Sequence, residues 1–511
     1  MSNSRLIFKN TIFLYFRQIL VLFVALFTTR IVINSLGIED YGLYNLIAGV
    51  VTMLNIITSS MTSATQRFLS MSLGKGNREE FQGVYDVCYT IYLVLCLFVL
   101  LVGEGLGSWF INTQLSIPVE RIEAANWCYQ FSILSFLLGV LRIPSNAVIF
   151  AYEKMDFYAY VSIVEVFFQM GIAYSLYITP YDHLISYSVL IAVSTVVINL
   201  IYSYYCRYKL QIRMQRISFS NKHIKPLLSF SFWTLFGSIA TIGTRQGINF
   251  LINIFGGVRL NAASAVATKV SSNAYNFVAN FTTAYRPQIM KLYAAKSFDE
   301  LYTLLYRTTK LSCFLFLVIL IPIDINIDSL LLLWLGEVPE YSSIFCRLLL
   351  LYLLIDAMQS PLIAMVHAIG NIKKFQIVLS SILILNIPIM WILLKMGQPI
   401  EYIYVCYVAL NVVSSVYRVF YVKNKSNLDF KKYMFITFRI IVTYAVSYSL
   451  SYIVVHNLSL NDSWTGLIGN CMACLVLSLF MIYLIGLNRS ERCFVYTFLK
   501  SRVFNRLSHQ K

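Results

Sequence analysis

The stretch TRIVINSLGIEDYGLYNLIAGVVTMLNIITSSMTSATQR, Thr29 to Arg67, decides the fold, because its pattern returns 219 positions later at Ile248 to Arg286. Each copy reads as the end of an apolar helix, a short glycine turn and a second helix that ends at an arginine. Repeats of this size are common in transporter folds. The gap-free alignment pairs Asn34 with Asn253, Gly37 with Gly256, Ala48 with Ala267, and Arg67 with Arg286.

The composition around this repeat is that of a membrane protein. Of the 511 residues 58% are hydrophobic and only 12% are charged, and the mean hydropathy is +0.70, which excludes a soluble globular protein. A bilayer-spanning helix needs about 20 apolar residues. About 14 runs are that long, at 10–34, 43–66, 84–110, 123–149, 157–178, 184–205, 227–255, 260–285, 302–325, 344–369, 375–396, 400–422, 433–455 and 463–486. The sequence therefore predicts an all-α polytopic membrane protein.

The first apolar run is too long for a cleavable signal peptide and lacks a small-residue cleavage site, so we expect it to stay as a span. An even number of spans separates the two copies of the repeat, which predicts two six-helix lobes of the same orientation, related by an axis along the membrane normal. The basic tail carries aromatic residues and is expected to lie on the inner membrane surface. The predicted parts are an N-terminal lobe (1–205), a basic cytoplasmic linker (206–226), a C-terminal lobe (227–422), extra helices 13 and 14 (423–486) and the tail (487–511).

The net charge of +17 is unevenly placed. If the N-terminus is inside, 31 of the 40 Lys and Arg residues fall in inner segments and five lie at outer loops. By the positive-inside rule both termini are expected in the cytoplasm, and anionic membrane lipids, not nucleic acid, are the expected partners of the basic surface. The cysteines lie in or beside apolar spans, so the CxxC at Cys471 and Cys474 indicates helix packing and no metal site.

Polar residues recur every three or four positions in several spans, which places them on one helix face. Ser and Thr also serve close helix contacts, but whole-face stripes on matching helices of two lobes predict a wet central cavity. The stripes are Thr52, Asn55, Ser59, Thr62, Ser63 and Gln66; Ser132, Ser135, Gly139, Arg142 and Asn146; Ser231, Thr234, Ser238, Thr241, Arg245 and Asn249; Asn261, Ser264, Thr268, Ser271 and Ser272; and Asp356, Gln359, Ser360 and His367.

Charged residues inside the spans sharpen this prediction. Burying a charge in a bilayer costs about 2.5–3.5 kcal/mol even on the lenient insertion scale, so such residues usually line water or are paired. Cations outnumber acids, which predicts a cavity that binds an anion. The candidate substrate-binding residues are Arg17, Arg142, Arg245, Lys269 and Arg30, and the candidate ion-coupling residues are Glu165 and Asp356.

Each of these residues also has a structural interpretation. For the charged residues it is a salt bridge, above all between Glu165 and Arg142. Arg30 sits at an outer helix end, where its side chain could simply reach the interface. Pro144 and Pro361 lie within their spans, each followed by a short basic turn, and proline there bends a helix.

Four segments resemble the O-antigen and polysaccharide repeat-unit flippases, the oligosaccharide and polysaccharide exporter branch of the multidrug/oligosaccharidyl-lipid/polysaccharide transporter superfamily. They are TTRIVINSLGIEDYGLYNLI (28–47), RFLSMSLGKGNREEF (67–81), AYEKMDFYAYVSI (151–163) and AIGNIKKF (368–375). The resemblance covers the first twelve spans. It implies two MATE-like six-helix lobes around a V-shaped cavity that works by alternating access.

The same resemblance implies the substrate and the place. The substrate would be an undecaprenyl-diphosphate-linked oligosaccharide, moved from the inner to the outer leaflet of a bacterial inner membrane for O-antigen, capsule or exopolysaccharide synthesis. Polysaccharide polymerase or assembly proteins would be partners, and no cofactor is implied. Related flippases place basic residues of spans one and eight in the cavity, which implies that role for Arg17 and Lys269.

Two alternatives remain open. An ion-coupled multidrug exporter of the same superfamily would favour a cavity dominated by acids, which differs from the excess of cations. A membrane glycosyltransferase or polymerase would need a sizeable outer segment with acids, whereas the longest one, 326–343, is short. The chain has no HExxH, nucleotide-type glycine loop or Ser/His/Asp arrangement, so we predict that it is not an enzyme.

Overall fold

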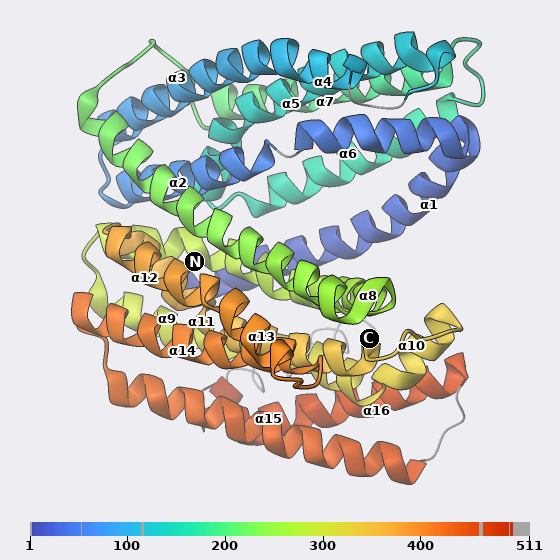
Figure 1. Ribbon diagram of the computed structural model, residues 1–511. Helices are drawn as coiled ribbons and strands as arrows, with labels where there is room; N and C mark the ends of the chain where they lie inside the picture. The colour runs from blue at the N-terminus through green and yellow to red at the C-terminus, as the bar shows by residue number, and fades with distance from the viewer. Residues whose placement is uncertain (1–2, 53, 114–116, 459–462, 490, 494–511) are drawn as a thin grey trace, which may run out of the picture. The chain divides into compact units, whose positions relative to one another are not determined.

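The computed structural model describes residues 3–52, 54–113, 117–458, 463–489 and 491–493, and these are helical with short connections (Figure 1). The α-helices are α1 (Asn3–Thr52), α2 (Asn55–Gly74), α3 (Arg78–Val102), α4 (Ser108–Thr113), α5 (Ile122–Ala151), α6 (Met155–Ser175), α7 (His183–Tyr208), α8 (Asn221–Ala294), α9 (Phe298–Ile325), α10 (Ile327–Leu335), α11 (Ser342–Ile369), α12 (Lys373–Ile384), α13 (Asn386–Lys395), α14 (Tyr402–Lys425), α15 (Phe430–Leu458) and α16 (Trp464–Met481). Three short helical segments, Gly103–Gly107, Val119–Arg121 and Ile482–Gly486, complete the set.

Twelve stretches in the described part of the chain are long and apolar enough to cross a membrane. One of them is α8, whose 74 residues contain two of the predicted spans. The predicted span 43–66 is divided between the end of α1 and α2, and the predicted span 375–396 between α12 and α13. The second break has a clear cause, because Pro388 has no amide hydrogen with which to bond the carbonyl of Ile384. The protein is thus a multi-pass, all-helical membrane protein.

The two copies of the repeat both contain a sharp bend at a glycine. Gly37 in α1 has φ 81° and ψ 164°, and Gly257 in α8 has φ 70° and ψ −172°. Residues with a side chain rarely adopt these angles, so glycine is needed at both bends. The gap-free alignment, which paired Gly37 with Gly256, is wrong by one residue here. The second copy carries two adjacent glycines, and it is the second of them that bends the chain.

The helices form two compact units, which do not coincide with the two halves of the sequence. The first unit contains 1–239, 283–298 and 367–376, so it includes the end of α8 and the turn between α11 and α12. The second unit contains 240–282, 299–366 and 377–511. The predicted linker, 206–226, contains the non-helical segment 209–220 together with the last residues of α7 and the first residues of α8.

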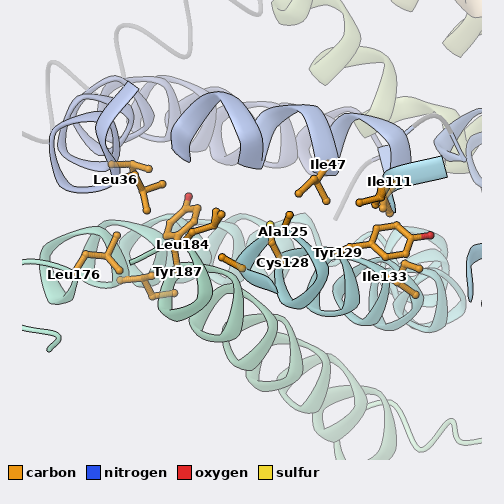
Figure 2. Close-up of a cluster of buried hydrophobic side chains, with 14 of the residues drawn as sticks. Leu36, Ile47, Ile111, Ala125, Cys128, Tyr129, Ile133, Leu176, Leu184 and Tyr187 are labelled. Atoms are coloured by element: carbon orange, nitrogen blue, oxygen red, sulfur yellow. The ribbon is translucent and has the colours of Figure 1, made fainter. Parts of the chain in front are cut away.

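The core of the first unit lies where α5 and α7 pack along each other and against α1. Figure 2 shows its side chains, among them Leu36, Ile47, Cys128 and Tyr187. Ala124 and Ala125 contribute to the same cluster, and small residues let membrane helices approach closely.

The core of the second unit is built from α8, α10, α11, α13 and α14, with Phe345, Met390 and Tyr404 among its buried side chains. The two extra helices α15 and α16 pack side by side (Figure 1). Two contacts hold the residues that follow α16. Arg439 of α15 donates to the carbonyl of Leu487 at 2.8 Å, and Lys310 of α9 forms an ion pair with Glu491 at 2.5 Å. Most of the predicted tail, residues 490 and 494–511, lies outside the described residues.

The turns after α5 and α11 repeat each other. Glu153 and Gly370 each lie nine positions after a helix-interior proline, Pro144 and Pro361, and both have positive φ, 58° and 85°. The repeat seen in the sequence therefore extends to these helices and their turns.

Candidate functional site

Inside the first unit, Arg17 of α1 is held by an aromatic residue of α6. Its guanidinium donates to the hydroxyl of Tyr158 at 2.8 Å and lies 4.9 Å from the centre of that ring. It also donates to the side-chain oxygen of its neighbour Gln18 at 3.2 Å. These contacts fix the guanidinium of Arg17 between α1 and α6.

Arg142 of α5 lies in the same cluster. It forms an ion pair with Glu165 of α6, with 3.3 Å between nitrogen and oxygen, and its guanidinium lies 5.5 Å from the ring centre of Tyr202 in α7. Tyr202 is also within electrostatic reach of Arg17. We call Arg17, Arg142, Tyr158, Glu165 and Tyr202 the first-unit cluster. The salt bridge predicted between Arg142 and Glu165 is present, and the cluster as a whole holds two cations and one acid.

The second unit contains a corresponding polar cluster around Asp356 of α11. Its carboxylate accepts a hydrogen bond from Tyr275 at 2.5 Å and lies 3.6 Å from the guanidinium of Arg418 in α14. Arg418 is 7% exposed and also donates to Gln359 at 2.5 Å. This arginine was missed as a site residue, because it was counted among the basic residues at the end of its span. The repeat could have pointed to this cluster. Gln359, which Arg418 contacts, lies two positions before Pro361, just as Arg142 lies two positions before Pro144.

The remaining predicted cations have exposed side chains. Arg30 lies in the first unit, and Arg245 and Lys269 lie in the second. Among the described residues no carboxylate forms an ion pair with any of these three. Arg245 is within electrostatic reach of Tyr407, which stacks on Tyr352 at a ring separation of 4.2 Å. In the first unit the structure therefore brings Arg17, Arg142 and Glu165 into one cluster, while Arg245 and Lys269 belong to the second unit.

The structure weakens the argument from the polar stripes for a water-filled cavity. Many of their hydroxyls donate to a carbonyl of their own helix: Thr62 to Thr58 at 2.7 Å, Ser135 to Phe131 at 2.8 Å, Thr234 to Phe230 at 2.8 Å and Ser238 to Thr234 at 3.0 Å. A hydroxyl satisfied in this way needs no water. The argument for an anion site rests on the charged residues.

A second buried network in the first unit surrounds Arg67, about two turns before α2 ends at Gly74. Arg67 is 7% exposed, and its guanidinium donates to the carbonyls of His367 and, at 3.4 Å, Ala368, at the end of α11. It lies 5.0 Å from the ring centre of Phe230. A Cβ at Gly370 would overlap this guanidinium, so glycine is required there for space as well as for its positive φ.

The repeat partner of Arg67 reaches the same place. Arg286 of α8 donates to Nδ1 of His367, so the two arginines that are identical in the aligned repeats converge on one histidine. Beside them Glu153, in the turn after α5, accepts hydrogen bonds from Gln288 at 2.7 Å and Lys291 at 2.5 Å. Sequence reasoning named these arginines only as markers of the repeat.

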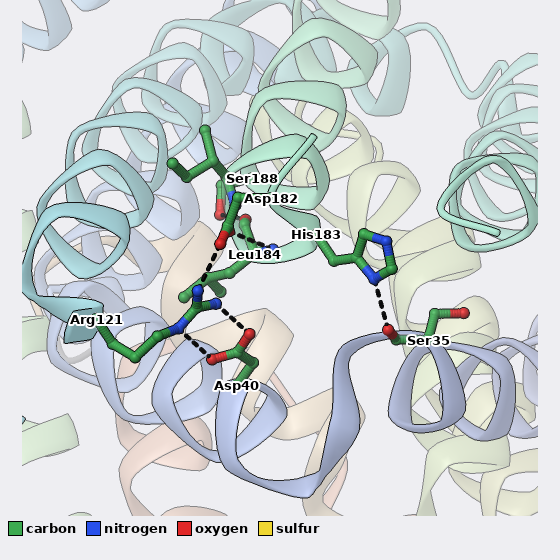
Figure 3. A network of polar contacts seen from close by, with 8 residues as sticks. Ser35, Asp40, Arg121, Asp182, His183, Leu184 and Ser188 are labelled. Carbon is green, nitrogen blue, oxygen red and sulfur yellow. Dashed lines mark hydrogen bonds and ion pairs between the residues drawn. The ribbon is translucent and has the colours of Figure 1, made fainter. Parts of the chain in front are cut away.

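The opposite end of the first unit, near the Gly37 bend, holds an ion cluster (Figure 3). Arg121 donates to Asp40 at 2.9 Å and to Asp182 at 2.5 Å. Asp182 also caps α7 by accepting from the amides of Leu184 and Ile185 at 3.0 and 3.1 Å, and His183 Nδ1 lies 2.8 Å from the carbonyl of Ser35. The cluster ties the bend of α1 to α5 and α7.

This cluster should make the first unit sensitive to acid. Burial alone would raise the pKa of Asp182, but hydrogen bonds from the amide of Ile185 and from Arg121 outweigh it and hold that pKa below its usual value. A lowered folded-state pKa adds stability above the unfolded value of about 4, which is lost as the pH falls through the folded value.

We therefore expect Asp182→Asn to lower the unfolding temperature at pH 7, and the difference from the unmodified protein to shrink as the pH falls below about 4. Asparagine caps helices about as well as aspartate, so the substitution isolates the charge. Unfolding curves of both proteins from pH 7 to pH 3 test this. A difference that does not change with pH would show that the charge of Asp182 contributes nothing.

Comparisons with known proteins add the fold family. No family model matches the chain. Uncharacterized membrane protein EpsK of Bacillus subtilis (strain 168) is 24% identical over 141 residues, which cover 28% of this chain and 26% of that protein. The match therefore spans only about a quarter of that relative.

Solved structures match over most of the chain. A MATE transporter in the bent conformation has a TM-score of 0.72 at 14% identity, covering 84% of this chain and 99% of that one. An outward-facing multidrug resistance MATE family transporter has 0.70 at 14%, covering 83% and 99%. A MOP superfamily transporter from Pyrococcus furiosus Vc1 (DSM3638), for which reverse polarity of the binding pocket suggests a different function, has 0.68 at 13%, covering 83% and 98%. The chain therefore has the fold of the MATE transporters of the MOP superfamily.

Proposed function

We propose that the protein is a flippase that carries a lipid-linked oligosaccharide, held by its diphosphate, from the inner to the outer leaflet of a bacterial plasma membrane. The observation that carries this proposal is the first-unit cluster, where two arginines and one glutamate lie within apolar helices. Arginine binds phosphate oxygens through a planar fork of donors. Tyr158 and Tyr202 flank the two guanidinium groups and give them fixed positions.

The membrane potential supplies a driving force for such a substrate. A diphosphate carries about two negative charges, and moving one charge outward from a negative interior yields roughly 2.3 kcal/mol per 100 mV. Export would then need no additional ion. We propose anionic membrane lipids and polysaccharide assembly proteins as partners and both termini in the cytoplasm.

An ion-coupled multidrug exporter is the second candidate, because the fold is equally that of multidrug MATE transporters. The observation in its favour is the pair of membrane-embedded acids, Glu165 and Asp356. Each of them, however, has an arginine partner in the structure, which leaves no net negative charge in either cluster to attract an organic cation.

The test is flipping in proteoliposomes of a fluorescent undecaprenyl-diphosphate oligosaccharide, with and without an imposed potential. Arg17→Ala and Arg142→Ala should each slow flipping at least about tenfold, which corresponds to roughly 1.4 kcal/mol. Lys269→Ala tests the cation of span eight, and Lys395→Ala, which removes an exposed cation beside Trp391, is the matched control. Folded protein that flips no lipid-linked sugar but moves organic cations would overturn the proposal in favour of the exporter.

A further inference from the structure

The segment that joins α7 to α8, residues 209–220, is a strap fixed along α3. Its peptide groups meet three residues of α3: the carbonyl of Arg213 accepts from Gln82 at 2.8 Å, the amide of Gln215 donates to Asp86 at 3.1 Å, and that of Ser218 donates to Thr90 at 3.1 Å. These α3 residues are four apart, so they form one line on the helix. The side chain of Ile212, in the strap, is buried.

The strap lies along the first part of the candidate span Arg78–Gly105, which contains α3. Because a helix rises about 1.5 Å per residue, Thr90 lies about 12 Å further along α3 than Gln82. The chain then returns, since the ring of His223 lies within van der Waals distance of the position that a Cβ on Gly83 would take. The tip of the strap, near Ser218, is thus its deepest point in the span.

Exposed apolar side chains at the tip of the strap lie between exposed cations. The tip carries Ile217 and Phe219, which are 66% and 65% exposed. The cations lie on either side of the tip, and all are exposed: Lys209, Arg213 and Arg216 in the strap, and Arg207, Lys222 and Lys225 in the adjoining helices. Residues 206–226 contain no acid. Of the nearby acids on α3, Glu80 pairs with Lys75 at 2.8 Å, Asp86 is buried, and Glu79 is exposed in the first turn of the helix.

We propose that the strap is a docking surface for anionic phospholipid. Its cations match the headgroup phosphates, and Ile217 and Phe219 match the boundary with the acyl chains, as in segments that lie in the membrane interface. The bonds to Asp86 and Thr90 hold the backbone in place, so that binding orders few residues. The surface is independent of what the protein transports.

Photo-crosslinking tests this on the full-length protein. Benzoylphenylalanine at position 219, in nanodiscs of equal phosphatidylglycerol and phosphatidylcholine, should crosslink to lipid, with phosphatidylglycerol enriched about threefold or more, since each basic residue near a surface attracts anionic lipid. Arg213→Gln with Arg216→Gln should bring the ratio to about one. Lys423→Gln with Lys425→Gln, which removes two exposed cations at the end of α14, should leave it unchanged.

A second variant separates charge from placement. Thr90→Val removes the acceptor for Ser218 and should lower crosslinking to both lipids while the protein still folds. Equal crosslinking to the two lipids, when position 219 carries the only substitution, would overturn the proposal. Crosslinking to another segment of the protein would overturn it as well, because the tip would then be covered by protein.

Discussion

Replacing Arg67 with alanine is expected to lower the free energy of unfolding of the first unit by about 3 kcal/mol or more, because hydrogen bonds to a charged group are worth about 1.5–3 kcal/mol each. The guanidinium bonds the carbonyls of His367 and Ala368, which at a helix end have no partner within the helix. It also lies over the rings of Phe68 and Phe230. The substitution leaves both carbonyls buried and opens a cavity.

Buried thiols provide the readout for this prediction. Cys88 and Cys206 lie buried in the first unit. In a protein whose second-unit cysteines are replaced by alanine, a thiol-reactive dye therefore follows the unfolding of the first unit with temperature. Arg67→Lys keeps the charge but not the planar fork of donors, and we expect an intermediate loss. Arg207→Ala removes an exposed arginine of α7 and should change stability by less than about 0.5 kcal/mol. If Arg67→Ala unfolds together with this control, the carbonyl contacts are not stabilising.

The Arg67 network shows how far the sequence leads and where it stops. Arg67 and Arg286 are identical positions of the repeat. The prediction that a helix ends at each of them is wrong, because α2 continues to Gly74 and α8 to Ala294. An alignment of this kind relates positions to each other but contains no information about what they touch. That both reach His367 depends on how α2, α8 and α11 lie next to one another in the first unit.

The spans were predictable for a physical reason. In a bilayer every backbone polar group must be bonded within the protein, so an apolar run of sufficient length becomes a helix whatever its neighbours are. The bend at Gly257 was misplaced by one residue because either of two adjacent glycines permits the required φ. Packing decides between them, and packing is not written in a single-sequence pattern.

For the charged residues, too, the sequence predicts one part of the outcome and packing decides the other. Their presence inside spans predicts that they are paired or line water, and the Arg142–Glu165 pair follows that rule. Asp356 was identified as a deep acid, but its partner Arg418 was not, since a cation at the end of a span is also what the positive-inside rule predicts. Only the fold shows that α14 brings this cation to α11.

Arg418→Ala should lower the free energy of unfolding of the second unit by about 3–5 kcal/mol, the usual cost of removing one partner from a buried ion pair. Asp356 would keep its bond to Tyr275 but lose its countercharge. Arg347→Ala is the matched control, because Arg347 pairs with Asp328 on the surface, where the two side chains are 45% and 66% exposed, and an exposed pair is worth about 0–1 kcal/mol. Equal losses for the two substitutions would mean that Arg418 is not effectively buried.

The pair of Asp356 and Arg418 also bears on ion coupling. One carboxylate oxygen of Asp356 faces Arg418 and the other accepts from Tyr275, so a proton or sodium ion would have to compete with both of these partners. We therefore expect Asp356→Asn to weaken unfolding stability while leaving the ion dependence of transport as in the unmodified protein. Transport measured at several pH values and sodium concentrations decides this. Transport that loses its response to either ion in Asp356→Asn, but retains it in Arg347→Ala, would show that Asp356 releases Arg418 during the cycle and binds the coupling ion.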